Sequence, residues 1–102
     1  MKRLVFWSRS ALDDLKQQMA WIARENPDAA RRTAARIRDA GDDLADFATG
    51  HAGRVAGTYE KSVGGLPYVV AYGIDRRGGE ELVVVLCVIH TARDWREGEW
   101  PG

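Results

Sequence analysis

Eight consecutive apolar residues, Leu82-Val83-Val84-Val85-Leu86-Cys87-Val88-Ile89, form the strongest structural signal in this chain of 102 residues. A run of this length and composition is typical of a strand that is covered on both faces. It is far shorter than the roughly 20 residues of a membrane-spanning helix. We therefore predict a central strand over Glu81–His90. Cys87, the only cysteine, lies inside it, so we expect a buried, inert thiol and no internal disulfide.

The residues before this run have the alternation of two further strands, over Val55–Val63 and Tyr68–Ile74. Turn-forming residues separate the three strands: Gly64-Gly65 follows the first, and Asp75–Gly79 follows the second. Connections this short join antiparallel neighbours, so we expect two hairpins. The stretch Thr49–Gly53, which precedes them, is expected to be a loop.

The chain begins with a predicted short strand over Lys2–Trp7, in which Leu4 and Phe6 share one face. Ser8 or Ser10 then offers a cap for a helix. Apolar residues recur in that helix every three or four positions and form one stripe: Leu12, Leu15, Met19 and Ile22. The polar residues between them are expected to face water: Asp13, Asp14, Lys16, Gln17 and Gln18.

A second helix is predicted to begin at Asn26-Pro27, because asparagine caps helices and proline suits the first helical position. Its small residues, such as Ala30 and Ala34, indicate close contact with a neighbouring helix. The short connection makes the two helices antiparallel. The predicted order is β-α-α-β-β-β, which makes this an α+β protein with a helical hairpin and antiparallel strands.

Composition limits the classes of function that the chain can serve. It contains 15 Lys and Arg residues against 15 Asp and Glu residues, so its formal net charge is zero. Any contact with nucleic acid must therefore come from a local patch. One cysteine and two distant histidines, His51 and His90, do not supply the ligands of a zinc site, and no cofactor motif is present. We expect one domain over residues 1–95 and a tail over residues 96–102.

Functional side chains are expected near one end of the sheet. His90 ends the predicted central strand, Arg93 and Trp95 follow it closely, and Arg54 precedes the first strand of the hairpins. Strand ends and adjoining loops are common places for binding or reactive groups. The alternative is that His90 bonds to backbone and that the arginines pair with nearby carboxylates. Trp95 and the more distal Trp100 suit an interface or local packing equally well.

Taken together, these features resemble the ParE branch of the RelE/ParE superfamily, the toxins of bacterial toxin–antitoxin modules. The resemblance extends over roughly residues 4–95. Its matching residues are Trp7-Ser8, Ala11, Asp14-Leu15, Ile22-Ala23, Asn26-Pro27, Ala29-Ala30, Gly53-Arg54, Leu66–Tyr72 and Val88–Trp95. The resemblance implies the β-α-α-β-β-β fold with its helical hairpin packed on a small antiparallel sheet, a cytoplasmic toxin of a plasmid-stabilisation type of module, and a cognate ParD-like antitoxin. It also implies inhibition of DNA gyrase, contact with operator DNA only through the antitoxin, and a higher-order hetero-oligomer.

The RelE-like members of the superfamily instead cleave mRNA on the ribosome, and the fold does not choose between the two activities. RelE-like proteins typically carry an arginine where this chain has Pro67-Tyr68, and a tyrosine where Thr91 follows His90. The zero net charge also differs from the basic surface expected of a ribosome-binding protein. The nuclease is therefore the second hypothesis, with His90, Arg54 and Lys61 as its catalytic group. A third is an inactive toxin that acts as an antitoxin-bound co-repressor.

The leading hypothesis is a binding inhibitor with no catalytic residues, no metal and no cofactor. Its expected target-binding residues are Arg54, Arg93, Trp95 and Trp100. An antitoxin segment is expected to bury apolar side chains of the helical hairpin. These are Leu15, Met19, Trp21, Ile22 and Ile37, among which Trp21 is the expected surplus beyond the core.

Overall fold

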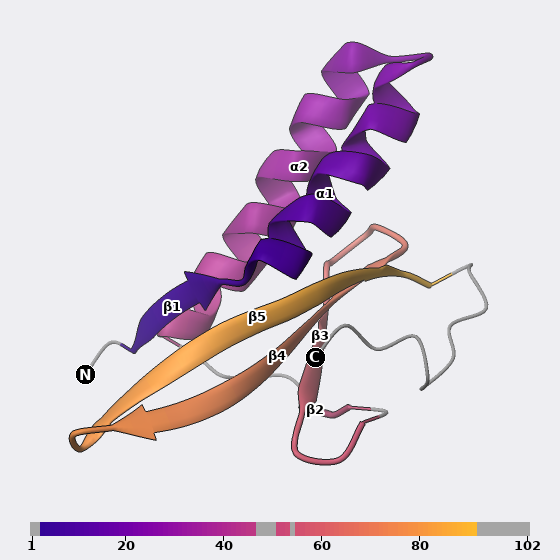
Figure 1. The fold of residues 1–102 in the computed structure, drawn as a ribbon. Coiled ribbons are helices and arrows are strands. Elements are labelled where there is room, and N and C mark those ends of the chain that lie inside the picture. The colour runs from indigo at the N-terminus through magenta and orange to yellow at the C-terminus, as the bar shows by residue number, and fades with distance from the viewer. Residues whose placement is uncertain (1–2, 47–50, 54, 92–102) are drawn as a thin grey trace.

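The computed structural model describes residues 3–46, 51–53 and 55–91. Two helices lie side by side on one face of a twisted sheet, and the connection between them projects beyond it (Figure 1). In chain order the elements are β1 (Leu4–Trp7), α1 (Arg9–Ala23), α2 (Pro27–Asp42), the short 3-10 helix η1 (Asp43–Ala45), β2 (His51–Ala52), β3 (Tyr59–Ser62), β4 (Tyr68–Arg77) and β5 (Glu80–His90). The predicted α+β fold with a helical hairpin is confirmed.

Both helices begin at side-chain caps. The Ala11 backbone N–H donates to Ser8 Oγ at 3.1 Å, so Ser8, rather than Ser10, caps α1. The Ala29 backbone N–H donates to Asn26 Oδ1 at 3.0 Å, and Pro27 occupies the first turn of α2. These caps satisfy amide groups that a helix start leaves without an intrahelical partner. Neither helix in the described part of the chain combines the length and apolar character of a membrane span.

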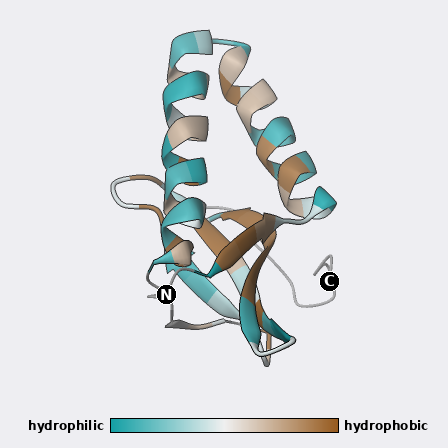
Figure 2. Cartoon of the chain, turned by 90° about the vertical axis from the view of Figure 1, so that its left-hand side faces the viewer, coloured by the Kyte–Doolittle hydropathy of each residue, from teal (hydrophilic) through white to brown (hydrophobic). Residues whose placement is uncertain are grey.

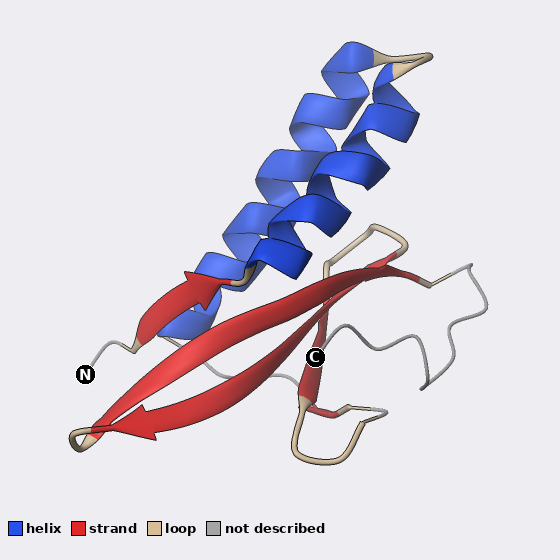
Figure 3. Cartoon of the chain, viewed as in Figure 1, coloured by secondary structure: helices blue, strands red, loops and turns tan. Residues whose placement is uncertain are grey.

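The sheet has the strand order β1-β5-β4-β3-β2 (Figure 3). β5 is an inner strand, as predicted, and β3, β4 and β5 are joined as antiparallel hairpins. β1 pairs with β5 in parallel, with Leu4 opposite Leu82, so the sheet is mixed rather than wholly antiparallel. A helical hairpin follows β1, and a long connection of this kind permits parallel pairing where a tight turn does not.

Several strand boundaries differ from those predicted. Residues His51–Ala52, expected in a loop, pair with β3, whereas the predicted strand over Val55–Val63 contains only Tyr59–Ser62. The Thr58 N–H bonds to the Val55 carbonyl at 3.1 Å, and Gly57 has a φ of 82°, so these residues form a turn. The second hairpin turn is shorter than expected, because only Gly78-Gly79, both at positive φ, separate β4 from β5.

The core lies between the helices and the sheet, and apolar strands lie beneath helices with many hydrophilic residues (Figure 2). Pairing between β4 and β5 is irregular at Ala71 and Tyr72, where Leu86 is the extra residue of a bulge. The bulge keeps Val85 and Val88 on the same face, toward the helices. They share the main core cluster with Trp7, Ala11, Leu15, Ile37, Val63, Tyr68 and Val70.

Gly41 is required by the packing of Trp7. A Cβ at position 41 would lie 2.3 Å from Trp7 Cζ2. The indole is 8% exposed, its Nε1 donates to Asp42 Oδ1 at 3.3 Å, and the Arg38 guanidinium lies 4.8 Å from the ring centroid. The ring therefore has little freedom to move aside.

We expect Gly41→Ala to lower the free energy of unfolding by about 1–3 kcal/mol through overpacking. Chemical denaturation monitored by circular dichroism measures this loss. Gly64→Ala is the matched control, because the nearest atom to its added Cβ is the end of the flexible Arg36 side chain at 4.0 Å. Equal stability of the two variants would show that Trp7 relaxes freely.

Candidate functional site

A groove of about 500 Å³ opens where β5 ends, between the helical hairpin and the connection from β3 to β4. Residues from α1, α2, β4, β5 and that connection line it. None of them is aspartate, glutamate, lysine or arginine, and three carry aromatic rings. They are Gln18, Trp21, Ile22, Thr33, Leu66, Pro67, Tyr68 and His90. The groove therefore suits an uncharged, largely apolar ligand surface.

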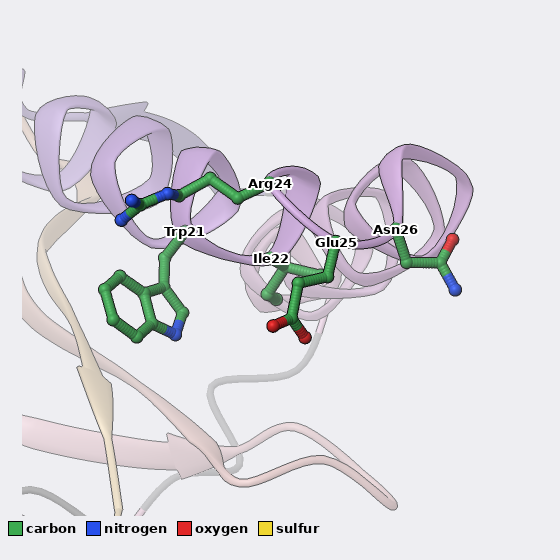
Figure 4. Close-up of a pocket in the computed structure, with 5 residues that line it drawn as sticks. All are labelled: Trp21, Ile22, Arg24, Glu25 and Asn26. Atoms are coloured by element: carbon green, nitrogen blue, oxygen red, sulfur yellow. The ribbon is translucent and has the colours of Figure 1, made fainter.

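Trp21 stands at the boundary of this groove and is 65% exposed. Trp21 also lines a second hollow, of about 590 Å³, together with Ile22, Arg24, Glu25 and Asn26 (Figure 4). Trp21, Ile22 and Glu25 project from the same side of the chain in this view, whereas Asn26 points away. The Arg24 guanidinium lies 5.3 Å from the indole centroid, a cation–π distance. An exposed tryptophan between two hollows is typical of an interface anchor.

His90 forms the sheet side of the groove. It pairs in register with Tyr68, and the two rings meet edge to face with centroids 5.1 Å apart. The next residue, Thr91, donates its backbone N–H to the Pro67 carbonyl at 2.9 Å. The end of β5 is thus attached to the groove wall.

Three polar side chains near or within α1 bind the β5 edge beyond the last residue that pairs with β1. Ser8 Oγ donates to the Leu86 carbonyl at 3.2 Å, and Asp14 Oδ2 accepts the Val88 N–H at 3.2 Å. Gln18 Nε2 donates to the Val88 carbonyl at 2.8 Å. The expectation that Asp14 and Gln18 face water is wrong, because the strand edge needs hydrogen-bond partners there. The sequence does hint at the burial of Gln18, because it lies three residues after Leu15 and four before Ile22, on the apolar side of the helix.

Burial raises the pKa of the Asp14 carboxyl above its ordinary value, the Val88 N–H opposes this shift, and Asp13 adds to it. A raised folded-state pKa means that the folded chain binds a proton more readily than the unfolded chain. Stability therefore falls as pH rises from the ordinary carboxyl range through the folded-state pKa, and the charge remains unfavourable at neutral pH.

We expect Asp14→Asn to raise the melting temperature at pH 7, because the amide oxygen still accepts the Val88 N–H without a charge. This gain shrinks as pH falls through the ordinary aspartate range. Asp14→Ala removes the acceptor and is expected to cost about 1 kcal/mol. Melting curves from pH 3 to 7 measure both effects, and a melting temperature of Asp14→Asn below wild type at pH 7 would contradict this account.

The residues predicted for antitoxin binding divide into surface and core. Trp21 is exposed, and the half-buried Ile22 lines the groove, while Met19 packs against the core. Leu15 is 8% exposed and Ile37 is fully buried, so both side chains belong to the core of this structure. Helical spacing identifies the apolar face of a helix. It does not separate core residues from groove residues, because on this hairpin both lie on that face.

Of the other predicted site residues, Lys61 and His90 lie within the described parts of the chain, in different hollows. Arg54, Arg93, Trp95 and Trp100 lie outside the described residues. Lys61 lines a separate hollow of about 250 Å³, together with Arg36, Asp39, Ala40, Asp43, Ser62, Val63 and Gly64. His90 lines the groove instead. Over residues 3–46, 51–53 and 55–91, no three His, Cys, Asp or Glu residues are placed to hold a metal ion.

Sequence reasoning assigned no role to the exposed apolar side chains of β1. Leu4 is 66% exposed and Phe6 is 56% exposed. They lie on the face of β1 away from the helices, because Trp7 and Val5 contribute to the core. This second apolar surface is separate from the groove and provides a control for it.

Comparison with known proteins identifies the family. The sequence model for the ParE toxin of the type II toxin–antitoxin system parDE matches residues 5–95. The chain belongs to the ParE toxin family. It is therefore a toxin of a type II toxin–antitoxin system, and its family implies an antitoxin partner.

Individual relatives agree with this assignment. The toxin is 36% identical over 95 residues to Y4kP of Sinorhizobium fredii, which is named as a toxin, covering 92% of this chain and 94% of that one. It is 34% identical over 90 residues to the toxin RelE2 of Caulobacter vibrioides, covering 87% and 96%. A solved structure of the chromosomal ParDE system from P. aeruginosa matches with a TM-score of 0.77 at 16% identity, covering 87% and 96%. This last likeness supports the fold alone.

Proposed function

We propose that this toxin inhibits DNA gyrase by binding to it, without catalysing a reaction, and that a cognate ParD-like antitoxin neutralises it in the cytoplasm. Membership of the ParE family supports this choice of target. The observation that carries the choice of binding over cleavage is the separation of Lys61 from His90, which line different hollows. Cleavage of RNA requires an acid, a base and phosphate-binding cations that converge on one phosphodiester.

The proposed target contacts are Arg54, Arg93, Trp95 and Trp100. Arginine and tryptophan are the residue types that most often dominate binding energy at protein interfaces. Three of the four follow Thr91, where the Pro67 carbonyl holds the end of β5. Purified toxin is expected to suppress ATP-dependent supercoiling by gyrase, which tests the proposal directly.

The proposed antitoxin surface is Trp21 with the adjoining groove. Two hollows flank an exposed indole, so a partner segment laid across α1 would bury Trp21 and fill apolar space beside it. In this proposal the antitoxin, not the toxin, contacts operator DNA, which agrees with the zero formal net charge of the toxin. A higher-order toxin–antitoxin assembly is part of the same proposal.

A ribosome-dependent endoribonuclease is the second candidate. Two observations favour it: His90 lines an open groove, and one relative is named RelE2. In this mechanism His90 would act as the acid or base, with Arg54 and Lys61 as the cations.

His90→Ala separates the two candidates. Under the gyrase proposal, the variant is expected to inhibit growth within about twofold of wild type, because histidine contributes no chemistry there. Growth of cells without antitoxin after induction measures this. Complete loss of toxicity in a variant that melts like wild type, with loss of discrete mRNA cuts, would favour the nuclease. His90→Gln, which keeps a polar side chain, controls for the loss of packing against Tyr68.

A further inference from the structure

Within the described residues, the groove wall contains a buried hydrogen-bond acceptor without a partner. Gln18 is only 7% exposed, and its Nε2 donates to the Val88 carbonyl at 2.8 Å. Its Oε1 is buried and has no hydrogen-bond partner within the described parts of the chain. If the side-chain amide of Gln18 were flipped, Oε1 would face the Val88 carbonyl oxygen, and two acceptors would be in contact. Nε2 therefore faces Val88, and Oε1 is the atom without a donor among the described residues.

A buried carbonyl oxygen without a donor is unfavourable, and folded proteins contain few of them. Trp21 and Ile22 follow Gln18 by three and four residues on α1. Side chains on a helix lean toward its N-terminus, so these two cover the turn that carries Gln18. Access to Oε1 therefore requires a rotation of one of these two side chains, and Trp21, at 65% exposed, is the less tightly packed of them.

The chemistry around this oxygen defines the ligand that would satisfy it. Among the described residues that line the groove there is no aspartate, glutamate, lysine or arginine, so they give no partner to a charged group, whose burial would be costly. Trp21, Tyr68 and His90 offer aromatic faces and edges for a ring. The fitting group is therefore an uncharged aromatic side chain that also carries an N–H or O–H donor.

We propose that the groove takes a tryptophan or tyrosine side chain of the antitoxin, whose N–H or O–H donates to Gln18 Oε1. This inference rests on the proposed antitoxin surface and adds a specificity residue to it. Gln18 selects the partner, because a side chain of similar shape without a donor leaves the oxygen buried and unpaired.

Indole and 1-methylindole test the chemistry without any antitoxin, since they differ in the donor. Titration into isotope-labelled toxin, followed by NMR shifts at Trp21 and His90, gives both dissociation constants. In wild type we expect 1-methylindole to bind about tenfold more weakly than indole. Gln18→Met should bring this ratio close to one. Gln17→Met, the same change at the exposed neighbouring position, should leave it unchanged.

A wild-type measurement keeps the test valid if Gln18→Met does not fold. The side-chain carbonyl carbon resonance of Gln18 should shift with indole and stay in place with 1-methylindole. Equal binding of the two probes, no binding of either, or a preference that survives Gln18→Met would overturn the proposal.

Competition with the antitoxin tests the identity of the occupant. The cognate antitoxin is expected to displace indole from the groove. An antitoxin that binds the toxin while indole remains bound would overturn this inference and leave neutralisation by the antitoxin intact. An antitoxin that does not bind at all would contradict the proposed function itself.

Discussion

A toxin truncated after Thr91 is expected to keep its fold and to lose its inhibition of growth. The truncation removes Arg93, Trp95 and Trp100, three of the four proposed gyrase contacts, whereas every described helix and strand ends by His90. Loss of two interface hot spots, each contributing about 2 kcal/mol or more, reduces potency by about 1,000-fold if the two losses add. Growth after induction in cells without antitoxin measures the effect, and circular dichroism checks the fold.

The full-length triple variant Arg93→Ala, Trp95→Ala, Trp100→Ala is the control for chain length. It is expected to match the truncation. Full toxicity in both proteins would remove the residues after Thr91 from the target interface. If the triple variant were toxic and the truncated protein were not, the loss would come from removal of the segment after Thr91 and not from these three side chains.

The second large effect is expected at the antitoxin interface. Trp21→Ala should weaken the toxin–antitoxin complex by about 2 kcal/mol or more, a factor of roughly 30, because a central tryptophan between two hollows acts as a hot spot. The free toxin should lose little stability, since the side chain is mostly exposed. Calorimetric titration of the purified partners measures the change.

Phe6→Ala is the matched control for this substitution. Phe6 is an exposed aromatic residue on β1, at a surface separate from the groove, and its removal should change the affinity by less than about threefold. An unchanged affinity in Trp21→Ala, together with a large loss in Phe6→Ala, would move the proposed antitoxin surface to the exposed apolar side chains of β1.

Local sequence rules predicted most of the fold because they act within a few residues. The helix starts follow from Ser8 and Asn26-Pro27, and the hairpins follow from glycine turns. The inner position of β5 follows from its unbroken apolar run. The parallel pairing of β1 was not predictable in this way, since it depends on where a helical hairpin returns the chain.

The site was harder to predict because the same helix supplies both core residues and groove residues. Leu15 and Trp21 were both candidates for binding by type and position, yet only Trp21 is exposed. Gln18 was assigned to the surface because glutamine is polar, whereas it binds the edge of β5 beyond the reach of β1. The burial of Gln18 depends on Val88 at a strand edge 70 residues away in the sequence, and helical periodicity contains no information about such a distant contact.

Under the proposed function, this toxin binds gyrase and cleaves no RNA itself. A supercoiling and DNA-cleavage assay with purified gyrase and ATP tests it most directly, beside a ribosome-dependent mRNA cleavage assay on the same preparation. We predict loss of supercoiling, accumulation of cleaved DNA and intact mRNA, all reversed by the cognate antitoxin. Normal supercoiling with discrete mRNA cuts that disappear in His90→Ala would contradict the claim.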